Sequence, residues 1–471
     1  MKMASPVLVI VLARVFGKEA FGLYVSTQLW VLTMSRLAVL GLDKGLHWYL
    51  PQNKITGRPD AEGIMESLWR AFSIASLLAL LISLAAILGL QRHFSELSHL
   101  SAGLISLYIA SAIPWVALHI FAGASEGNRK PQYKIFINDF TVPVSTSLIA
   151  LSLHYYGIGV LSLPLGLFSA NVIGALLFLF LMTRQFPKIH WWTRKKVSPV
   201  LLHYSLPLGF SEVVVSFLLR ADLWMVLIFL GPANAGVYAV MITISNGIRT
   251  IRQSFNPILL PVVAGMDKQR LQTDLKPIYT YCVSMVTLIQ LGIGFFIVLF
   301  PEQTLMIAGK NYISSPEVLG VLIFGNLMSG MFGLSAAVLN GIGQSKFMLK
   351  MNIVSLVVAL SMNSLLIPKF GLIGAAMSTF CFQAVQAFWL NFKLLRLKLW
   401  PYQKSLFVQG SWILLILILY ILVNTILPLE LWQKISAFMV FVLGLVITLL
   451  AQGLLHFNLK KSSGNANTGA P

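Results

Sequence analysis

The stretch LARVFGKEAFGLY, residues 12–24, has a counterpart far along the chain in IFLGPANAGVY, residues 228–238. Three pairs of residues keep a separation of 214 positions: Gly17 and Gly231, Gly22 and Gly236, and Tyr24 and Tyr238. Apolar residues flank both copies, and glycine permits the backbone conformations that a sharp turn requires. The two stretches therefore predict the same corner between two apolar helices, built twice in one chain.

The composition is that of a protein embedded in a lipid bilayer. Of 471 residues, 57% are hydrophobic and 10% are charged, whereas about 25% of the residues in an average soluble protein are charged. Apolar runs recur along the whole length, and several approach the roughly 20 residues that cross a bilayer as a helix. Cys282 and Cys381 lie within such runs, so we expect buried thiols and neither a disulfide nor a metal site. The sequence predicts an all-α integral membrane protein without a cofactor.

Hydropathy, with charges, glycines and prolines as boundaries, predicts about fourteen membrane spans. They cover residues 1–16, 21–41, 67–90, 100–122, 135–155, 158–182, 203–230, 235–256, 277–300, 317–340, 347–367, 372–392, 405–427 and 433–456. Only 16 residues precede Gly17, so the first span is expected to be shortened, by roughly ten residues relative to a full crossing.

The basic residues divide unevenly between the connections on the two sides of the predicted membrane. One set of alternate connections carries 25 lysines and arginines, and the other carries only Lys18, Arg92, Lys310, Lys369 and Lys434. Cytoplasmic connections are enriched in lysine and arginine, so both termini are predicted to be cytoplasmic. The net charge of +19 is mostly this topology signal, with some attraction to anionic membrane lipid, and does not indicate a nucleic-acid partner.

Two further pairs of stretches recur at nearly the same separation. GNRKPQYK at 127–134 is matched by GQSKFMLK at 343–350, and YYGIGVLSLPLG at 155–166 is matched by KFGLIGAAMSTF at 369–380. The chain is therefore predicted to contain two parallel six-helix lobes, an arrangement in which transporters place the substrate between the repeated halves.

The predicted domain boundaries follow from this repeat. They are an N-terminal lobe at 1–182, a basic cytoplasmic linker at 183–200, a C-terminal lobe at 201–398, transmembrane helices 13 and 14 at 399–456, and a polar cytoplasmic tail at 457–471.

Four stretches together resemble a known family of membrane proteins. They are LARVFGKEAFGLY, GLDKGLHWYLPQ at 41–52, RADLWMVLIFLGPANAGVYAV at 220–240, and GIGQSKFMLKMNIVSLVVALSMNSLLIPKFGLIGAA at 341–376. They resemble the polysaccharide transporters, the O-antigen and exopolysaccharide flippases of the multidrug/oligosaccharidyl-lipid/polysaccharide exporter superfamily. The resemblance covers nearly the whole chain and includes Asp222, and the short first span is the main departure from the pattern.

The resemblance implies a function and a location. Such proteins flip undecaprenyl-diphosphate-linked oligosaccharide from the inner to the outer leaflet of the bacterial inner membrane by alternating access. The implied partners are the lipid-linked oligosaccharide, membrane lipid and other membrane proteins of polysaccharide assembly. No enzymatic activity is implied, so no catalytic residue is expected.

Charged side chains inside the predicted spans are the candidate site residues, because such charges are costly and usually face a cavity or a partner. Arg36 lies in the second span, and its guanidinium suits paired hydrogen bonds to a diphosphate. The alternative for Arg36 is snorkelling to the cytoplasmic interface.

The seventh predicted span carries Glu212, Arg220 and Asp222 as further substrate-binding candidates. Glu212, Ser216 and Arg220 recur every four residues, which predicts one polar face on a continuous helix. Glu212 and Asp222 are also candidates for coupling to H⁺ or Na⁺, because burial favours the protonated form of a carboxylate. The alternative for the whole group is an ion-pair network that joins helices.

Arg249 and Arg252 lie at the cytoplasmic end of the eighth predicted span. They are candidates for guiding lipid headgroups inward, with ordinary positive-inside topology as the alternative.

Other functions on the same architecture stay open at this point. A flippase for the lipid-linked peptidoglycan precursor fits the same charges, whereas a multidrug or cation antiporter predicts a cavity dominated by acidic residues. A membrane polysaccharide polymerase would require catalytic groups on a sizeable outer loop. The predicted external connections are short and lack paired carboxylates, which disfavours an enzyme.

Overall fold

The computed structural model describes residues 4–46, 73, 75–81, 110–127, 130–185, 199–264, 266, 268–332, 334–399, 411–412, 415 and 430–451. Within these residues every regular element is a helix and no strand occurs. Most of the predicted spans 67–90 and 405–427, most of the predicted linker 183–200 and all of the predicted tail 457–471 lie outside the described residues.

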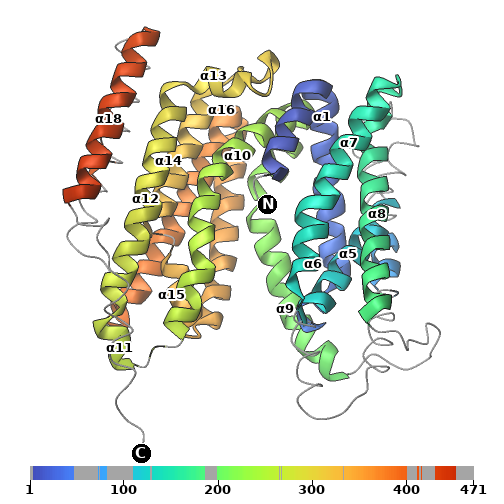
Figure 1. The fold of residues 1–471 in the computed structure, drawn as a ribbon, viewed down its shortest axis with the longest axis horizontal. Helices are drawn as coiled ribbons and strands as arrows, with labels where there is room; N and C mark the ends of the chain where they lie inside the picture. Colours follow the sequence, from blue (N-terminus) through green and yellow to red (C-terminus); the bar gives the residue numbers. More distant parts are fainter. Residues whose placement is uncertain are drawn as a thin grey trace, which may run out of the picture. The chain divides into compact units, whose positions relative to one another are not determined.

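The repeated corner is present in both places (Figure 1). Helix α1 (Ala4–Val39) breaks at Gly17, with φ 74° and ψ 171°. Helix α10 (Ala221–Ala264) breaks at Gly231, with φ 82° and ψ 176°. A side chain with a Cβ atom is strained at these positive φ values, so the glycines fix where each helix turns. The near-identical angles confirm the prediction that the chain builds one corner twice.

A second kind of corner lies in helix α16 (Ser345–Arg396), which breaks at Gly371 with φ 60° and ψ −135°. As a straight helix its 52 residues would measure about 80 Å, more than twice the roughly 30 Å of a bilayer core. Gly157, the residue paired with Gly371 in the predicted repeat, also has a positive φ, of 83°. The break therefore separates the predicted spans 347–367 and 372–392.

The contacts within the chain define two compact units. Unit 1 comprises Met1–Ile244, Leu305–Ser315 and Asn352–Ser378, and unit 2 comprises Ser245–Thr304, Pro316–Met351 and Thr379–Pro471. The lobes at 1–182 and 201–398 rest on the sequence repeat, and their boundaries stay a prediction.

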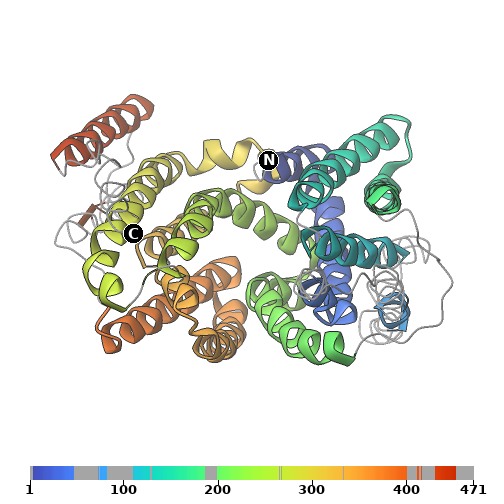
Figure 2. The ribbon, with the colours of Figure 1, turned by 60° about the horizontal axis from the view of Figure 1, so that its bottom comes forward.

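Unit 1 is built around the two arms of α1, one before and one after the break at Gly17. Its other elements include α5 (Ala112–Gly127), α6 (Pro131–Phe136), the π-helix η2 (Ile137–Thr141), α7 (Val142–Tyr155), the 3-10 turn η3 (Gly159–Leu161), α8 (Ser162–Gln185), α9 (Pro199–Leu218) and the first part of α10. Helices α7 and α8 lie side by side, α5 packs against α8, and α1 contacts α5, α7 and α9 (Figures 1 and 2).

Unit 2 contains α11 (Lys268–Thr273), α12 (Leu275–Leu299), α14 (Pro316–Phe332), α15 (Ser335–Gly341) and α18 (Leu431–Ala451). Helix α12 packs against α14 and against α18. A short connection with α13 (Pro301–Met306) and the turn η4 (Lys310–Tyr312) follows α12. A buried chain of hydrogen bonds runs from the Tyr279 hydroxyl through Ser335 Oγ to Asn391 Oδ1, with two contacts of 2.9 Å.

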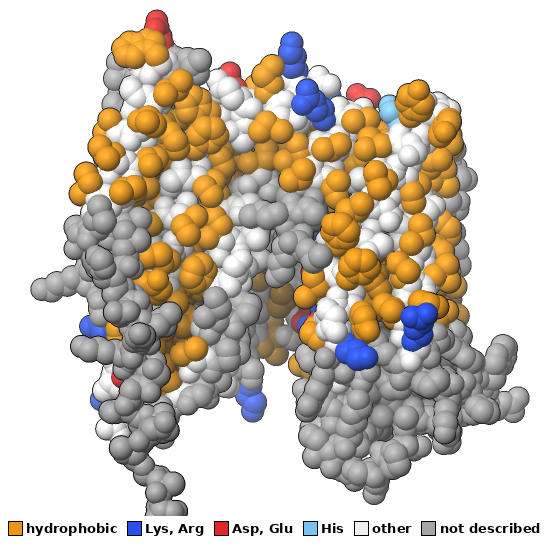
Figure 3. All heavy atoms as spheres, in the orientation of Figure 1, with side chains coloured by type: hydrophobic (Ala, Val, Ile, Leu, Met, Phe, Trp, Pro, Cys, Tyr) orange, Lys and Arg blue, Asp and Glu red, His pale blue; other side chains and the backbone are white. Residues whose placement is uncertain are grey.

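Several helices among the described residues are long and apolar enough to cross a membrane. They are Pro131–Tyr155, Ser162–Leu181, Ala221–Asn256, Leu275–Leu299 and Lys346–Arg396, with the bent pair Pro316–Phe332 and Ser335–Gly341 as a further candidate. Hydrophobic side chains cover the sides of the helices, and Lys and Arg side chains gather near their ends (Figure 3). The protein is an all-helical multi-pass membrane protein, as predicted, and the number of fourteen spans stays a prediction.

The corner at Gly17 and the corner at Gly231 also touch each other within unit 1. A Cβ atom on Gly22 would lie 2.2 Å from the carbonyl oxygen of Pro232, and one on Gly236 would lie 2.6 Å from Cα of Gly22. Side-chain carbons do not approach backbone so closely. The second glycine of each repeated stretch is therefore required by the packing of one corner on the other.

Candidate functional site

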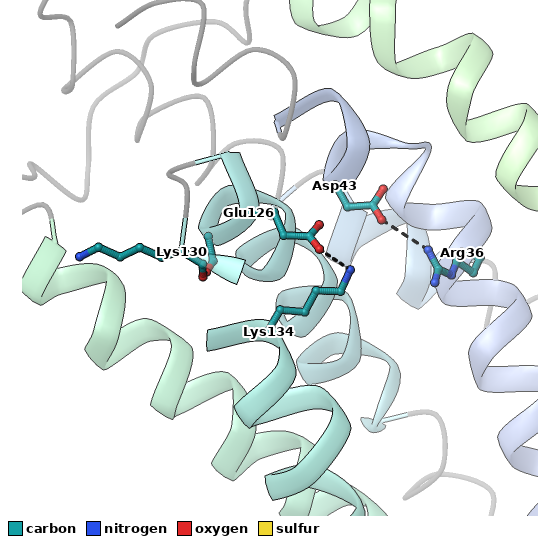
Figure 4. A network of polar contacts seen from close by, with 6 residues as sticks. Arg36, Asp43, Glu126, Lys130 and Lys134 are labelled. Carbon is teal, nitrogen blue, oxygen red and sulfur yellow. Dashed lines mark hydrogen bonds and ion pairs between the residues drawn. The ribbon is translucent and has the colours of Figure 1, made fainter. Parts of the chain in front are cut away.

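Arg36 lies in the last turn of α1, on the arm that follows the Gly17 break. Its Nη1 atom lies 3.4 Å from Oδ2 of Asp43 (Figure 4), and its guanidinium carbon lies 5.6 Å from the centre of the Trp115 ring. The Arg36 side chain keeps 27% of its surface exposed. Arg36 is thus held by one long ion pair and one aromatic face, and part of its guanidinium remains available to a ligand.

The turn that precedes Asp43 is fixed by close backbone packing. Helix α1 ends at Val39, and Leu40 and Gly41 both have positive φ, of 49° and 73°. A Cβ atom on Gly41 would lie 2.4 Å from the backbone nitrogen of Gly209 in α9, and one on Gly123 in α5 would lie 2.2 Å from the carbonyl oxygen of Asp43. Two helices therefore clamp this turn, which places the Asp43 carboxylate within reach of Arg36.

A second ion pair lies near the same turn. Nζ of Lys134 in α6 lies 2.8 Å from Oε1 of Glu126 in α5, whereas Lys130 points away from both pairs (Figure 4). The His119 and Trp115 rings lie against each other at a tilt, with ring centres 3.7 Å apart, and the positive charges of Arg36, Lys134 and Lys44 all act on His119. Arg36 of α1, Lys44 and Lys134 of α6 thus place positive charge at this end of unit 1.

Arg220 lies at a break that the sequence did not reveal. Helix α9 ends at Leu218 and α10 begins at Ala221, and the Arg220 N–H donates to the Phe217 carbonyl at 3.1 Å. The prediction of one continuous helix across 203–230 is wrong, and the single polar face of Glu212, Ser216 and Arg220 stays a prediction. Glu212 and Ser216 are half-buried on α9, and Arg220 lies in the turn between the two helices.

The Arg220 side chain is exposed although protein surrounds it on most sides. In the described part of the chain no carboxylate lies within ion-pair distance of its guanidinium. Arg36 repels Arg220 and Asp222 attracts it, so the two arginines lie within electrostatic reach of each other inside unit 1. Both predicted cations thus belong to unit 1; Arg36 is paired with Asp43, and Arg220 has no ion-paired carboxylate among the described residues.

Asp222 has a different environment from Arg220. Its side chain is buried, with 7% of its surface exposed. Its carboxylate accepts the Leu223 backbone N–H at 2.8 Å and the Tyr238 hydroxyl at 3.2 Å. Asp222 thus lies in the first turn of α10 and ties this turn to the helix after the Gly231 corner, which is a structural role. Roles of Glu212 and Asp222 in ion coupling stay predictions.

Arg249 and Arg252 belong to unit 2, on the arm of α10 that follows Gly231. Both are half-buried, and Arg252 lies within electrostatic reach of Arg249 and of Tyr279. Their role in guiding headgroups stays a prediction. Among the described residues no three His, Cys, Asp or Glu side chains come together as metal ligands.

Comparison with known structures agrees with this architecture of apolar helices. The structure of "Lipid II flippase MurJ, inward closed conformation" is similar, with a TM-score of 0.70 and 12% identity over 97% of this chain and 96% of that chain. An inward-facing multidrug resistance transporter of the MATE family and MOP superfamily is similar with a TM-score of 0.60 and 16% identity, over 84% of this chain and 96% of that chain. The fold is therefore that of these multi-pass membrane transporters.

The family is shown by the sequence match. Residues 1–266 match the family described as "Polysaccharide biosynthesis protein", and this is more than half of the chain. The protein belongs to this family. It is also 30% identical over 156 residues to an uncharacterised membrane protein of Methanocaldococcus jannaschii. That match covers 32% of this chain and spans about 28% of the relative's length.

Proposed function

We propose that the protein flips an undecaprenyl-diphosphate-linked oligosaccharide across the bacterial inner membrane by alternating access, with both termini in the cytoplasm. The family of polysaccharide biosynthesis proteins supports a role with glycans. The fold it shares with a lipid II flippase supports a lipid-linked substrate that stays in contact with membrane lipid.

The observation that carries the proposal is the environment of Arg220. An arginine at mid-membrane costs roughly 3 kcal/mol on insertion scales, and among the described residues no carboxylate forms an ion pair with Arg220. Arg220 is nevertheless accessible, and Arg36 lies within its electrostatic reach. Two guanidiniums that repel each other form a favourable site for a ligand with two linked phosphates, because each donates paired hydrogen bonds to phosphate oxygens.

The chemistry of transport requires no covalent step from these residues. Arg220 and Arg36 hold the diphosphate away from hydrocarbon, the glycan follows a polar path, and the polyprenyl tail remains in lipid. Asp43 competes with the diphosphate for Arg36. Because the contact between Asp43 and Arg36 is long, at 3.4 Å, Arg36 can both bind the diphosphate and release it. Coupling to H⁺ or Na⁺ through Glu212 is part of the proposal, as are partner proteins of polysaccharide assembly.

The test in cells measures lipid-linked oligosaccharide that accumulates on the inner leaflet when the protein is absent. Wild type is expected to clear it. Arg220→Lys is expected to clear it at an intermediate rate, because its ammonium keeps the charge but not the paired hydrogen bonds. Arg220→Ala and Arg36→Ala are expected to clear it about tenfold to a hundredfold more slowly, the equivalent of one charged hydrogen-bonding group. Arg184→Ala is the matched control, because Arg184 is exposed and contacts the Phe180 ring at 4.6 Å.

The outcomes separate the competing functions. If unpolymerised units reach the outer leaflet at the normal rate in cells that lack the protein, the flippase proposal is wrong, and a polymerase or a drug exporter takes its place. If peptidoglycan precursor accumulates instead, the transport chemistry holds and the glycan is different. Equal membrane abundance of all variants is required for either conclusion.

A further inference from the structure

A partly open cavity of about 190 Å³ lies in unit 1 and is lined by residues of α1, α5, η2, α7 and α8. Apolar side chains form part of its wall. The remaining wall is polar or aromatic and consists of Tyr24, Gln28, Trp115, Asn138, Thr146, Ser147 and Asn171. None of the residues that line it is charged, which distinguishes it from the site around Arg36 and Arg220.

Two carboxamides in this wall have polar atoms without a protein partner. Asn171 is 1% exposed, and its Nδ2 atom forms no hydrogen bond. Oδ1 of Asn138 is likewise buried and without a hydrogen bond. The hydroxyls of Thr146 and Ser147, by contrast, donate to backbone carbonyls at 2.8 and 3.0 Å. Rotating an amide by 180° exchanges donor and acceptor but does not supply the missing partners.

The local backbone places Asn138 in the wall through an irregular turn. Asn138 belongs to η2, a π-helical segment that ends at Thr141, shortly before Pro143. Proline has no N–H to donate within a helix. π-Helical turns are rare and occur frequently at functional sites. The chain therefore keeps a less regular helix and two amides with unpaired atoms at one cavity, and both features cost stability. A bound ligand that pairs with these amides offsets both costs.

The chemistry of the wall specifies the ligand. A buried donor and a buried acceptor call for a neutral group that both accepts and donates, as a hydroxyl does, and Tyr24 and Trp115 offer apolar ring faces beside them. The absence of a carboxylate among the lining residues disfavours a cation. The cavity volume of about 190 Å³ suits one sugar ring.

We propose that this cavity is a carbohydrate subsite in which Asn138 and Asn171 bind the hydroxyls of one sugar ring of the transported lipid. The inference rests on the proposed flippase function, since it assigns part of the same substrate. Arg36 and Arg220 bind the diphosphate whatever the glycan is, and the carboxamides of the cavity distinguish one glycan from another.

The test uses the full chain in lipid nanodiscs and two probes: synthetic undecaprenyl diphosphate, and the lipid-linked oligosaccharide extracted from the cells that produce the protein. Asn171→Leu and Asn138→Leu keep the number and branching of the side-chain heavy atoms and remove the amide. Each is expected to weaken binding of the glycan-bearing probe about threefold to tenfold, the equivalent of one neutral hydrogen bond, and to leave binding of undecaprenyl diphosphate unchanged.

Asn363→Leu is the matched control. Asn363 is also 1% exposed with both amide atoms unpartnered, yet it lies on α16 and does not line the cavity. Its substitution is expected to leave both affinities unchanged. If Asn171→Leu and Asn138→Leu weaken both probes equally, or neither, the subsite is overturned while the flippase proposal stands. If wild type binds neither probe, the proposed function itself fails.

Discussion

Substituting Gly22 by alanine tests how closely the two repeated corners pack within unit 1. A Cβ atom at this position would lie 2.2 Å from the carbonyl oxygen of Pro232 and 3.2 Å from Cα of Ala233. Both neighbours are backbone atoms, so no flexible side chain can move aside. The two corners would have to separate by about 1 Å to restore an ordinary contact, which overpacks one of the tightest places in the unit.

The expected cost follows from two opposing effects. Overpacking a well-packed interior costs about 1–3 kcal/mol, and replacing glycine by alanine inside a helix gains about 1 kcal/mol. Gly22 lies in the helical arm that follows the Gly17 break, so both effects apply. We expect Gly22→Ala to lower the free energy of unfolding by up to about 2 kcal/mol.

Gly247→Ala provides the matched control. Gly247 is also in a helix, in α10, and has no positive φ, and a Cβ atom added to it would meet no neighbouring atom within 4 Å. The free energy of unfolding of Gly247→Ala should therefore show only the gain that comes from the higher helix propensity of alanine. Unfolding of both variants in detergent, followed by tryptophan fluorescence against denaturant concentration, gives the comparison. If Gly22→Ala is as stable as Gly247→Ala, the close approach of the corners is wrong.

Two hydrogen-bonded sites give further predictions. The Tyr312 hydroxyl donates to the Ala13 carbonyl at 3.0 Å, so Tyr312→Phe should cost about 1 kcal/mol in the same unfolding assay. Burial raises the pKa of Tyr312 above its ordinary value near 10; the unfolded chain therefore loses this proton first, and stability should fall as the pH rises above about 10, less steeply in Tyr312→Phe. Ser335→Ala removes the link between Tyr279 and Asn391 and should cost about 1–3 kcal/mol; an unchanged unfolding midpoint would show that this chain of hydrogen bonds does not contribute.

The sequence predicted the features of the fold that glycine and hydropathy determine. Gly17 and Gly231 turn their helices where the repeat placed the corners, and Gly371 separates two predicted spans inside one long helix. Such positions are legible because a positive φ restricts the residue to glycine in most cases. The close contact between the corners was not predicted, because spacing along a chain does not show which segments meet.

The candidate site was only partly predictable. Arg36 and Arg220 were singled out because charges are rare within apolar spans, and the structure brings them within electrostatic reach. The break at Arg220 was missed because the sequence around it contains neither glycine nor proline, and hydropathy continues across it. Asp43 was missed as the partner of Arg36 because it follows the end of α1, beyond a turn that packing defines.

In the sequence, the carboxamides of the cavity indicate a binding site more weakly than the buried charges do. Asn138 and Asn171 are single polar residues in apolar stretches, and such residues are often satisfied within their own helix or by a neighbour. Only the positions of surrounding atoms show that two of their amide atoms have no partner. An uncharged site of this kind is therefore found from the structure and not from composition.

A flipping assay with the purified protein in proteoliposomes tests directly whether the protein moves lipid-linked oligosaccharide across a bilayer. The assay loads the lipid-linked oligosaccharide into both leaflets and measures how fast a membrane-impermeant glycan-binding or glycan-cleaving reagent gains access to the inner pool. We expect wild type to exchange the whole pool, Arg220→Ala to exchange it at least tenfold more slowly, and Arg184→Ala to match wild type. Exchange by wild type no faster than in protein-free vesicles, or equal exchange by wild type and Arg220→Ala, would contradict it.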